Sequence, residues 1–221
     1  MLGNHGRSIT KAIFTPVARV LVAAHITPNM VTIAGTVVTI AVAVTTFPFG
    51  YLWQGALALA VVLFCDSIDG VLARMSGTSS PFGAFLDSTM DRLGDGAVFG
   101  SLTAFAIFSM ESSPSRTVSI VAGLITIVGA ATVSYSRARA ESIGVIAKVG
   151  IAERTDRLII ALLGAALYGW GAPAVVFAAS LCWVAFASIV TVIQRVHFTA
   201  THLPSPQESQ CQDAPWYGLS E

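Results

Sequence analysis

Residues 62–95 read VLFCDSIDGVLARMSGTSSPFGAFLDSTMDRLGD, and this stretch decides the fold of the chain. Apolar residues continue from both of its ends, so residues 51–74 and 82–108 can each form a helix of about 20 residues or more, enough to cross a membrane. A turn signal, SGTSSP at residues 76–81, separates the two. Because antiparallel helices joined by a short loop are neighbours, the stretch predicts a helical hairpin that carries acidic residues inside a membrane.

The apolar pattern extends over most of the chain. The sequence is 54% hydrophobic and only 11% charged, whereas soluble domains carry about a quarter charged residues. Turn signals rich in Pro, Gly and Ser separate the apolar stretches, and the fifth stretch is short and interrupted by glycine. The predicted spans are residues 28–48, 51–74, 82–108, 115–139, 155–170 and 173–197. The predicted fold class is therefore all-α, an integral membrane bundle of six transmembrane helices.

Polar segments flank the bundle. Residues 6–24 alternate apolar and basic faces, which predicts an N-terminal amphipathic helix in the membrane interface, kinked or split at Pro16. A solvated turn is the alternative. The predicted domains are a cytoplasmic amphipathic juxtamembrane segment (1–25), the six-helix transmembrane domain (26–198) and a disordered cytoplasmic tail (199–221).

The positions of the basic residues predict the orientation. Of the twelve Lys and Arg residues, only Arg116 falls on the side opposite to both termini. The positive-inside rule then places both termini in the cytoplasm, as six spans require. We expect a multi-pass protein of the plasma membrane. The formal net charge is zero, which gives no reason to expect a nucleic-acid partner.

Five carboxylates lie inside the predicted spans, and they are the decisive functional signal. They are Asp66 and Asp69 in the second span and Asp87, Asp91 and Asp95 in the third. On insertion scales each costs roughly 2.5–3.5 kcal/mol near the centre of a spanning helix. Together they would cost on the order of 10 kcal/mol even with shallow placement. A purely structural scaffold offers nothing to offset this cost.

Helix geometry indicates what offsets it. Asp66 and Asp69 are spaced i, i+3, and Asp87 and Asp91 are spaced i, i+4, so each pair shares one helix face. All four can meet at one depth, roughly 8–13 Å below the cytoplasmic helix ends. Four such carboxylates cannot stay ionised together without cations, and oxygen ligands favour Mg²⁺ or Mn²⁺. Two ions suit four acids.

Residues beside the acids have two interpretations each. Gly70 and Gly83 either leave the backbone open for a ligand or pack helices closely. Arg74 is placed for a pyrophosphate oxygen, or it is a snorkelling charge at the water boundary. Asp95 continues the acidic stripe one turn deeper, where it could support the site or pair with another buried group.

The stretch from Asp66 to Asp91 resembles the signature of the CDP-alcohol phosphotransferase family, D-x2-D-G-x2-A-R-x8-G-x3-D-x3-D. All eight specified positions match at the expected spacing. The resemblance implies six helices, a cytoplasmic amphipathic N-terminal segment, a homodimer and a polar cavity open to the cytoplasm. It also implies an enzyme that transfers the phosphatidyl group of CDP-diacylglycerol to an alcohol.

The resemblance assigns roles to individual residues. The two metal ions would be held by Asp66, Asp69, Asp87 and Asp91, and Asp91 would also act as general base on the acceptor hydroxyl. The CDP-lipid would be contacted by Asn29, Met30, Val31, Thr32, Gly70, Arg74 and Ser80. On their own, Asn29 and Thr32 are ordinary helix-start residues.

A second cluster of basic residues bears on the acceptor alcohol. Ser134, Arg137, Arg154, Arg157 and Arg195 could form a cationic cup suited to a dianionic phosphate. The alternative is that they are topology charges, with helix-surface pairs to Glu141, Glu153 and Asp156. The stretch SYSRARAESIG (134–144) and the following ERTDR (153–157) resemble actinobacterial phosphatidylinositol phosphate synthases within the family. This implies inositol phosphate as acceptor, with phosphatidylinositol phosphate and CMP as products.

Other functions remain open at this point. The archaeal archaetidylinositol phosphate synthases look alike in the same stretch, and phosphatidylglycerophosphate synthase is an alternative because glycerol phosphate also needs a cationic cup. A cation-coupled transporter is the alternative from a different class, since pumps also bind cations through intramembrane acids. Against it, the acids cluster near one face and no pair of interrupted helices marks a midplane site.

Overall fold

The computed structural model describes residues 27–76 and 80–203, and among these the side chains of all but residues 65–76. The described residues form helices and connections and contain no strand. The helices are α2 (Pro28–Thr46), the short 3-10 helix η1 (Phe47–Phe49), α3 (Leu52–Ser76), α4 (Pro81–Phe108), α5 (Pro114–Glu141), α6 (Arg154–Gly169) and α7 (Ala174–His202). Each of the six predicted spans corresponds to one α-helix, so the all-α prediction is confirmed.

Hydroxyl side chains followed by proline set where three of the helices begin. Thr27, Ser80 and Ser113 are N-caps that accept a hydrogen bond from the backbone N–H three residues later, at 3.3, 3.0 and 3.2 Å. A proline follows each cap, where its fixed φ suits a first helical turn and its missing N–H costs no hydrogen bond. These caps explain why α2, α4 and α5 begin at the predicted turns.

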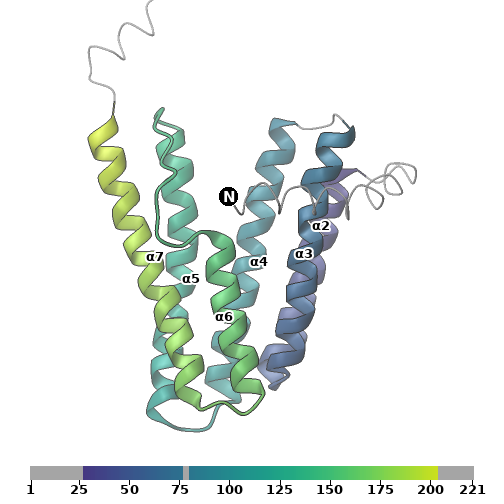
Figure 1. Cartoon of the computed structure of the whole chain (residues 1–221), viewed down its shortest axis with the longest axis vertical. Helices are drawn as coiled ribbons and strands as arrows, with labels where there is room; N and C mark the ends of the chain where they lie inside the picture. The colour runs from purple at the N-terminus through teal and green to yellow at the C-terminus, as the bar shows by residue number, and fades with distance from the viewer. Residues whose placement is uncertain (1–26, 77–79, 204–221) are drawn as a thin grey trace, which may run out of the picture.

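The helices run up and down the long axis of the molecule (Figure 1). The connections α2–α3, α4–α5 and α6–α7 lie at one end, and α3 ends, α4 begins and α5 and α7 end at the other. Helix α6 is shorter than its neighbours, and the α5–α6 connection (142–153) descends beside the bundle before α6 begins. The first residue of α6, Arg154, therefore lies inside the bundle rather than at its end.

Helix packing is tight around the lower part of α4, α6 and α7. The rings of Phe105, Tyr168 and Phe177 contact one another with centroids 5.7–5.9 Å apart. Gly164 on α6 lies against the Ser180 side chain of α7, and a Cβ at this glycine would overlap that side chain. The apolar core thus packs together the end of the bundle that carries the α4–α5 and α6–α7 connections.

Within residues 27–76 and 80–203, three helical segments are long and apolar enough to cross a membrane, namely Pro28–Phe49, Pro114–Glu141 and Ala174–His202. Helix α4 carries Asp87, Asp91, Arg92 and Asp95 in its first half, and α6 has only 16 residues. Length and composition therefore support a membrane-associated bundle, while six spans remain a prediction.

Both predicted terminal segments fall largely outside the described residues. The amphipathic helix predicted for residues 6–24 lies there entirely. At the other end, α7 continues to His202, where the Thr201 hydroxyl donates to the His197 carbonyl at 3.1 Å. The first four residues of the predicted tail, 199–202, are therefore helical, because the last turn of α7 continues beyond the apolar span, and residues 204–221 lie outside the description.

Candidate active site

Three acidic residues lie on one face of α4 and become more buried along the helix. Asp87 is exposed, Asp91 has 21% of its side chain exposed, and Asp95 has 5% exposed. They follow one another at i, i+4 and i+8, so one face of the helix points all three in the same direction. This face leads from the start of α4, near which α3 ends, toward the interior of the bundle.

The other two predicted metal ligands, Asp66 and Asp69, belong to α3, and their side chains are outside the description. Their backbone positions precede the end of α3 at Ser76, while Asp87 and Asp91 follow the start of α4 at Pro81. At 1.5 Å per residue, all four lie between about 9 and 15 Å from the joined helix ends. The backbone is thus consistent with the predicted common depth.

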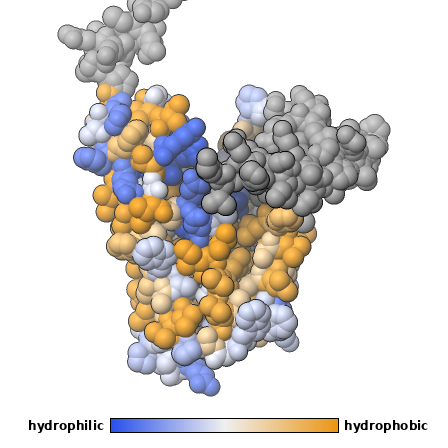
Figure 2. Space-filling view, in the orientation of Figure 1, coloured by the Kyte–Doolittle hydropathy of each residue, from blue (hydrophilic) through white to orange (hydrophobic). Residues whose placement is uncertain are grey.

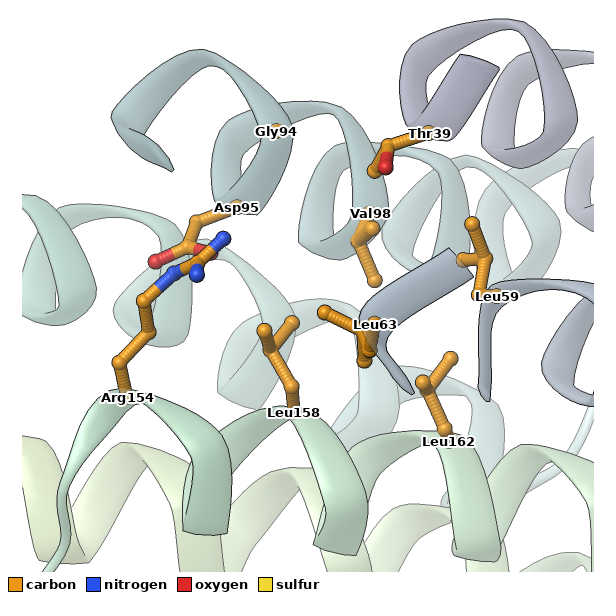
Figure 3. Close-up of a pocket in the computed structure, with 9 residues that line it drawn as sticks. All are labelled: Thr39, Leu59, Leu63, Gly94, Asp95, Val98, Arg154, Leu158 and Leu162. Atoms are coloured by element: carbon orange, nitrogen blue, oxygen red, sulfur yellow. The ribbon is translucent and has the colours of Figure 1, made fainter. Parts of the chain in front are cut away.

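Arg154 contacts two of these three acidic residues. Its Nε lies 2.9 Å from Asp95 Oδ1, and its Nη1 lies 2.9 Å from Asp91 Oδ1. Figure 3 shows the Asp95 and Arg154 side chains pointing toward one another from α4 and α6. Arg92 adds a longer contact of 3.3 Å to Asp91 Oδ2. Arg154 is a predicted member of the acceptor cup, and in the structure it also contacts Asp91, the candidate general base.

Arg157 lies one turn further along α6 and is only 2% exposed. Its Nε and Nη1 atoms are buried and have no hydrogen-bond partner among the described residues. Its charge lies within electrostatic range of Asp95, Arg154 and Arg195. A buried guanidinium with unused donors is costly, which makes this position a strong candidate for binding an anion.

Arg195 on α7 is held by backbone carbonyl groups. Its Nε donates to the Val149 carbonyl at 3.0 Å and its Nη1 donates to the Val133 carbonyl. Val133 precedes Ser134, so these bonds bring Arg195 beside the predicted acceptor residue of α5. The Ser134 hydroxyl donates to the Ala130 carbonyl of its own helix at 3.3 Å.

Arg137 is exposed and pairs with Glu141, with 2.9 Å between Nε and Oε1. This is the helix-surface pair that the alternative interpretation anticipated. Arg137 also lies within electrostatic range of Arg195. A continuous series of cations thus runs from α5 through α7 to α6 and ends at Asp91. Its members are Arg137, Arg195, Arg157 and Arg154. Glu141 pairs with the first of these cations and Asp91 and Asp95 pair with the last, so the positive charge that a bound anion would offset lies mainly at Arg157 and Arg195.

The hydrophilic surface lies where these arginines gather. Figure 2 shows hydrophilic residues in the upper part of the bundle, a mainly hydrophobic zone below them, and a paler, partly hydrophilic rim at the bottom. Arg137 and Arg139 lie in the last two turns of α5, which ends in that upper part. The cationic series therefore begins at the hydrophilic end of the bundle.

Residues predicted to contact the CDP-lipid meet at the starts of α2 and α4. A Cβ at Gly83 would lie 3.2 Å from Asn29 Oδ1 and 3.3 Å from Ser80 Oγ, so the three residues are in contact. Met30 is exposed and Val31 is half-buried. The Thr32 hydroxyl donates to the Pro28 carbonyl at 3.2 Å, as expected of an ordinary helix-start residue. Gly70 and Arg74 lie on α3 within the part whose side chains are not described.

Sequence reasoning missed two participants. Arg92 entered the sequence prediction only as one of the twelve basic residues that set the orientation, although its position next to Asp91 was a signal that could have been used. Asp95 was recognised as part of the stripe, but its partner was not, because Arg154 is 59 residues away. Helical spacing identifies residues that share a face and does not identify the partner on another helix.

The donor chemistry fits hard divalent cations. Asp87 and Asp91 offer only oxygen atoms on one face, and Asp66 and Asp69 lie at the same depth by backbone position. Among the residues with described side chains, no group of three or more His, Cys, Asp or Glu is close enough to hold a metal. The predicted ligand set also includes the α3 pair, whose side chains are not described.

These groups together offer carboxylates for cations and a proton, and arginines for a phosphate beside them. An oxygen nucleophile bound by the arginines would have a carboxylate base nearby in Asp91. Transfer of a phosphorus-containing group between two oxygens is the chemistry that this arrangement supports best.

Comparison with known proteins agrees with this chemistry. The phosphatidylinositol phosphate synthase of Mycolicibacterium smegmatis is 45% identical over 190 residues, covering 84% of this chain and 83% of that protein. The enzyme of that name from Corynebacterium glutamicum is 38% identical over 196 residues, covering 89% and 88%.

Solved structures of the Mycobacterium tuberculosis phosphatidylinositol phosphate synthase share the fold. The complex with manganese and citrate superposes with a TM-score of 0.80 at 38% identity, covering 85% of this chain and 89% of that one. The complex with CDP-DAG bound gives the same TM-score and covers 86% and 94%. A model of the CDP-alcohol phosphatidyltransferase family matches residues 25–194. As the signature from Asp66 to Asp91 predicts, this chain belongs to the CDP-alcohol phosphatidyltransferase family.

Proposed function

We propose that this chain transfers the phosphatidyl group of CDP-diacylglycerol to inositol phosphate, releasing CMP and forming phosphatidylinositol phosphate. The observation that carries the acceptor assignment is the series of arginines that ends at Asp91. Arginine suits a phosphate dianion because its planar fork binds two oxygens at once. Relatives named for this activity are 38–45% identical to the chain.

The cationic cup of the proposal consists of Ser134, Arg137, Arg154, Arg157 and Arg195. Arg154 and Arg195 are held in place by Asp95 and by backbone carbonyl groups, so they are pre-organised before an acceptor arrives. Arg157 contributes buried donors that lack a partner among the described residues. Pre-organisation lowers the entropic cost of binding a small, highly charged acceptor.

The CDP-lipid lies, in this proposal, between the starts of α2 and α4. Asn29, Ser80 and Gly83 are in contact there, and the lack of a side chain at Gly83 permits this close approach. We place Met30, Val31, Thr32, Gly70 and Arg74 in the same binding region. The diacylglycerol chains would extend along the apolar helix surfaces into the surrounding membrane lipid.

We assign Asp66, Asp69, Asp87 and Asp91 to two Mg²⁺ ions, with Mn²⁺ as the alternative; a relative's structure contains manganese. When bound, such ions neutralise the pyrophosphate and stabilise the departing CMP. Asp91 accepts the proton of the acceptor hydroxyl as that oxygen attacks the phosphorus bearing the diacylglycerol. The bond from this phosphorus to the oxygen of CMP breaks, and CMP leaves with the electron pair.

The proposed setting is the plasma membrane, with six spans, both termini in the cytoplasm and the site open to it. Arg137 and Arg139 lie in the last two turns of α5 at one end of the bundle, whereas Arg116 caps α4 at the other by donating to the Ile107 carbonyl at 2.7 Å. At that second end Trp53 and Trp170 pack with centroids 6.3 Å apart, as in an interfacial aromatic belt. We further propose a homodimer.

An acceptor panel tests the proposal. The purified protein in detergent is given CDP-diacylglycerol and Mg²⁺ with inositol phosphate, glycerol 3-phosphate or free inositol, and CMP release is measured. We expect turnover with inositol phosphate, little with the other two, and loss of turnover with a chelator. Faster turnover with glycerol 3-phosphate would replace the acceptor assignment. Absence of CMP with every phosphorylated alcohol would reject the enzymatic function itself and leave a cation-coupled transporter.

A further inference from the structure

The inference concerns Asp95, which the motif of the family does not include. Its Oδ1 accepts the Nε–H of Arg154 at 2.9 Å, while the Nη1 of the same guanidinium contacts Asp91 at 2.9 Å. Asp91 and Asp95 are one helical turn apart, so a single planar guanidinium spans both carboxylates. A guanidinium is a rigid fork, and fixing Nε and Nη1 fixes the direction of the whole plane.

Asp95 lies at the boundary between the polar site and the apolar interior. A small cavity beside the pair is lined by Asp95 and Arg154 themselves and by apolar side chains that include Leu63, Val98, Leu158 and Leu162 (Figure 3). The Oδ2 atom of Asp95 is buried and has no hydrogen-bond partner among the described residues. Burying a carboxylate in this way is costly, and buried ion pairs contribute little net stability compared with apolar residues. The Asp95–Arg154 pair is therefore better explained by the direction that it imposes on the guanidinium than by a gain in stability.

We propose that Asp95 is a positioning residue that holds the Arg154 guanidinium between the candidate base Asp91 and the phosphate of the acceptor. The proposal rests on the proposed function, because it needs an anionic acceptor beside Asp91. Asp95 acts through Arg154 and does not touch the acceptor or a metal ion. It also offsets the charge of Arg154, so that Asp91 is not left facing an uncompensated cation.

A purely structural role for the pair makes different predictions. The Asp95–Arg154 contact could serve only to tether the start of α6 to α4, since α6 packs mainly against α3 and α7. Loss of a tether would lower the melting temperature and leave acceptor affinity unchanged. Loss of positioning would change acceptor affinity at an unchanged melting temperature.

The sign of the affinity change separates positioning from simple electrostatics. Asp95→Asn removes a negative charge beside a cationic cup, so long-range electrostatics alone would tighten the binding of an anion. If Asp95 positions Arg154, the same substitution weakens binding, because a neutral amide oxygen accepts the Nε–H bond less strongly than a carboxylate and fixes the guanidinium less firmly. We expect Asp95→Asn to weaken inositol phosphate binding about tenfold in calorimetry without CDP-diacylglycerol, with the KM for CDP-diacylglycerol unchanged.

A double-mutant cycle with Arg154→Met completes the experiment. Asp95→Asn should weaken binding in the wild-type background and fail to weaken it further when Arg154 is already methionine. Arg154→Lys, which keeps the charge but lacks the fork, should reproduce the loss caused by Asp95→Asn. Glu111→Gln, which removes an exposed charge at the opposite end, is the matched control and should change nothing.

Three outcomes overturn the proposal: equal or tighter binding by Asp95→Asn, additive effects in the cycle, or normal affinity with a lowered melting temperature. If Asp95→Asn does not fold, Arg154→Lys with wild-type affinity overturns it instead. Failure of the proposed function is distinct, because the wild type would then release no CMP with inositol phosphate. Inorganic phosphate as the calorimetric probe would still decide whether Asp95 positions Arg154.

Discussion

The Nε of Arg195 lies 3.0 Å from the carbonyl oxygen of Val149, and this hydrogen bond ties α7 to the α5–α6 connection. The same guanidinium donates to the Val133 carbonyl, so it also reaches α5. Three separate segments therefore meet at one cation. Because a backbone carbonyl satisfies a donor without neutralising its charge, Arg195 keeps its full positive charge available for an anion.

Arg195→Ala should impair use of inositol phosphate much more than use of CDP-diacylglycerol. We expect the KM for inositol phosphate to rise between about tenfold and a hundredfold, since loss of a charge-assisted contact costs about 1.5–3 kcal/mol. Steady-state kinetics with each substrate varied in turn measures both values. Arg139→Ala, which removes an exposed charge near the same end of α5, is the control. Equal effects on the two substrates would contradict a role in the acceptor cup.

Gly150 permits the connection that carries Val149 to pass close to α7. Its φ is +149°, and a Cβ there would lie 2.5 Å from Thr191 Cγ2. Gly150→Ala should therefore combine backbone strain of about 1–3 kcal/mol with a steric overlap. We expect a lower melting temperature and a higher KM for inositol phosphate, because Val149 and Arg195 would shift.

Two variants separate the overlap from the strain. Gly144→Ala places alanine at φ +83° with nothing within 4 Å, so it reports the strain alone. Thr191→Ser removes the methyl group that overlaps, so combining it with Gly150→Ala should restore part of the lost stability. A Gly150→Ala protein that melts like the wild type would show that the connection is not held by this contact.

The sequence was sufficient to predict the helices but not their contacts. Thr27-Pro28, Ser80-Pro81 and Ser113-Pro114 mark the beginnings of three helices because the cap and proline act locally, within one turn. The contacts Arg154–Asp95 and Arg195–Val149 join residues 59 and 46 positions apart. They depend on α6 beginning partway down the bundle, and no local pattern specifies that depth.

Asp91→Asn should abolish transfer while the protein still inserts and folds. An amide cannot accept the proton of the acceptor hydroxyl, and general-base catalysis contributes about 10²–10⁴-fold in rate. The substitution also removes a proposed metal ligand, so the loss of rate should lie at the upper end of this range. Single-turnover CMP release at saturating substrates is the measurement, with Glu111→Gln as the control. Activity within tenfold of the wild type would remove Asp91 from the role of base.

Gly83→Ala should weaken the use of CDP-diacylglycerol selectively. The added Cβ would press on Asn29 Oδ1 at 3.2 Å and on Ser80 Oγ at 3.3 Å, displacing the starts of α2 and α4. We expect the KM for CDP-diacylglycerol to rise about tenfold, or about 1.4 kcal/mol, with the KM for inositol phosphate unchanged. Gly100→Ala, on the same helix with open space around it, is the matched control. A parallel rise in both KM values would indicate a general disturbance of α4.

Arg157→Met tests whether a buried arginine serves binding or stability. Arg157 is 2% exposed, and its buried Nε and Nη1 lack hydrogen-bond partners among the described residues, so its charge costs free energy in the ligand-free protein. Methionine fills similar space without that cost, and replacing buried ionic groups by apolar ones is often neutral or stabilising by about 1–4 kcal/mol. We therefore expect an unchanged or higher melting temperature together with a KM for inositol phosphate raised about tenfold. Arg157→Ala should lower the melting temperature because it leaves a cavity. If the methionine variant instead melts earlier and keeps its acceptor affinity, the guanidinium contributes to packing and the cationic cup ends at Arg154.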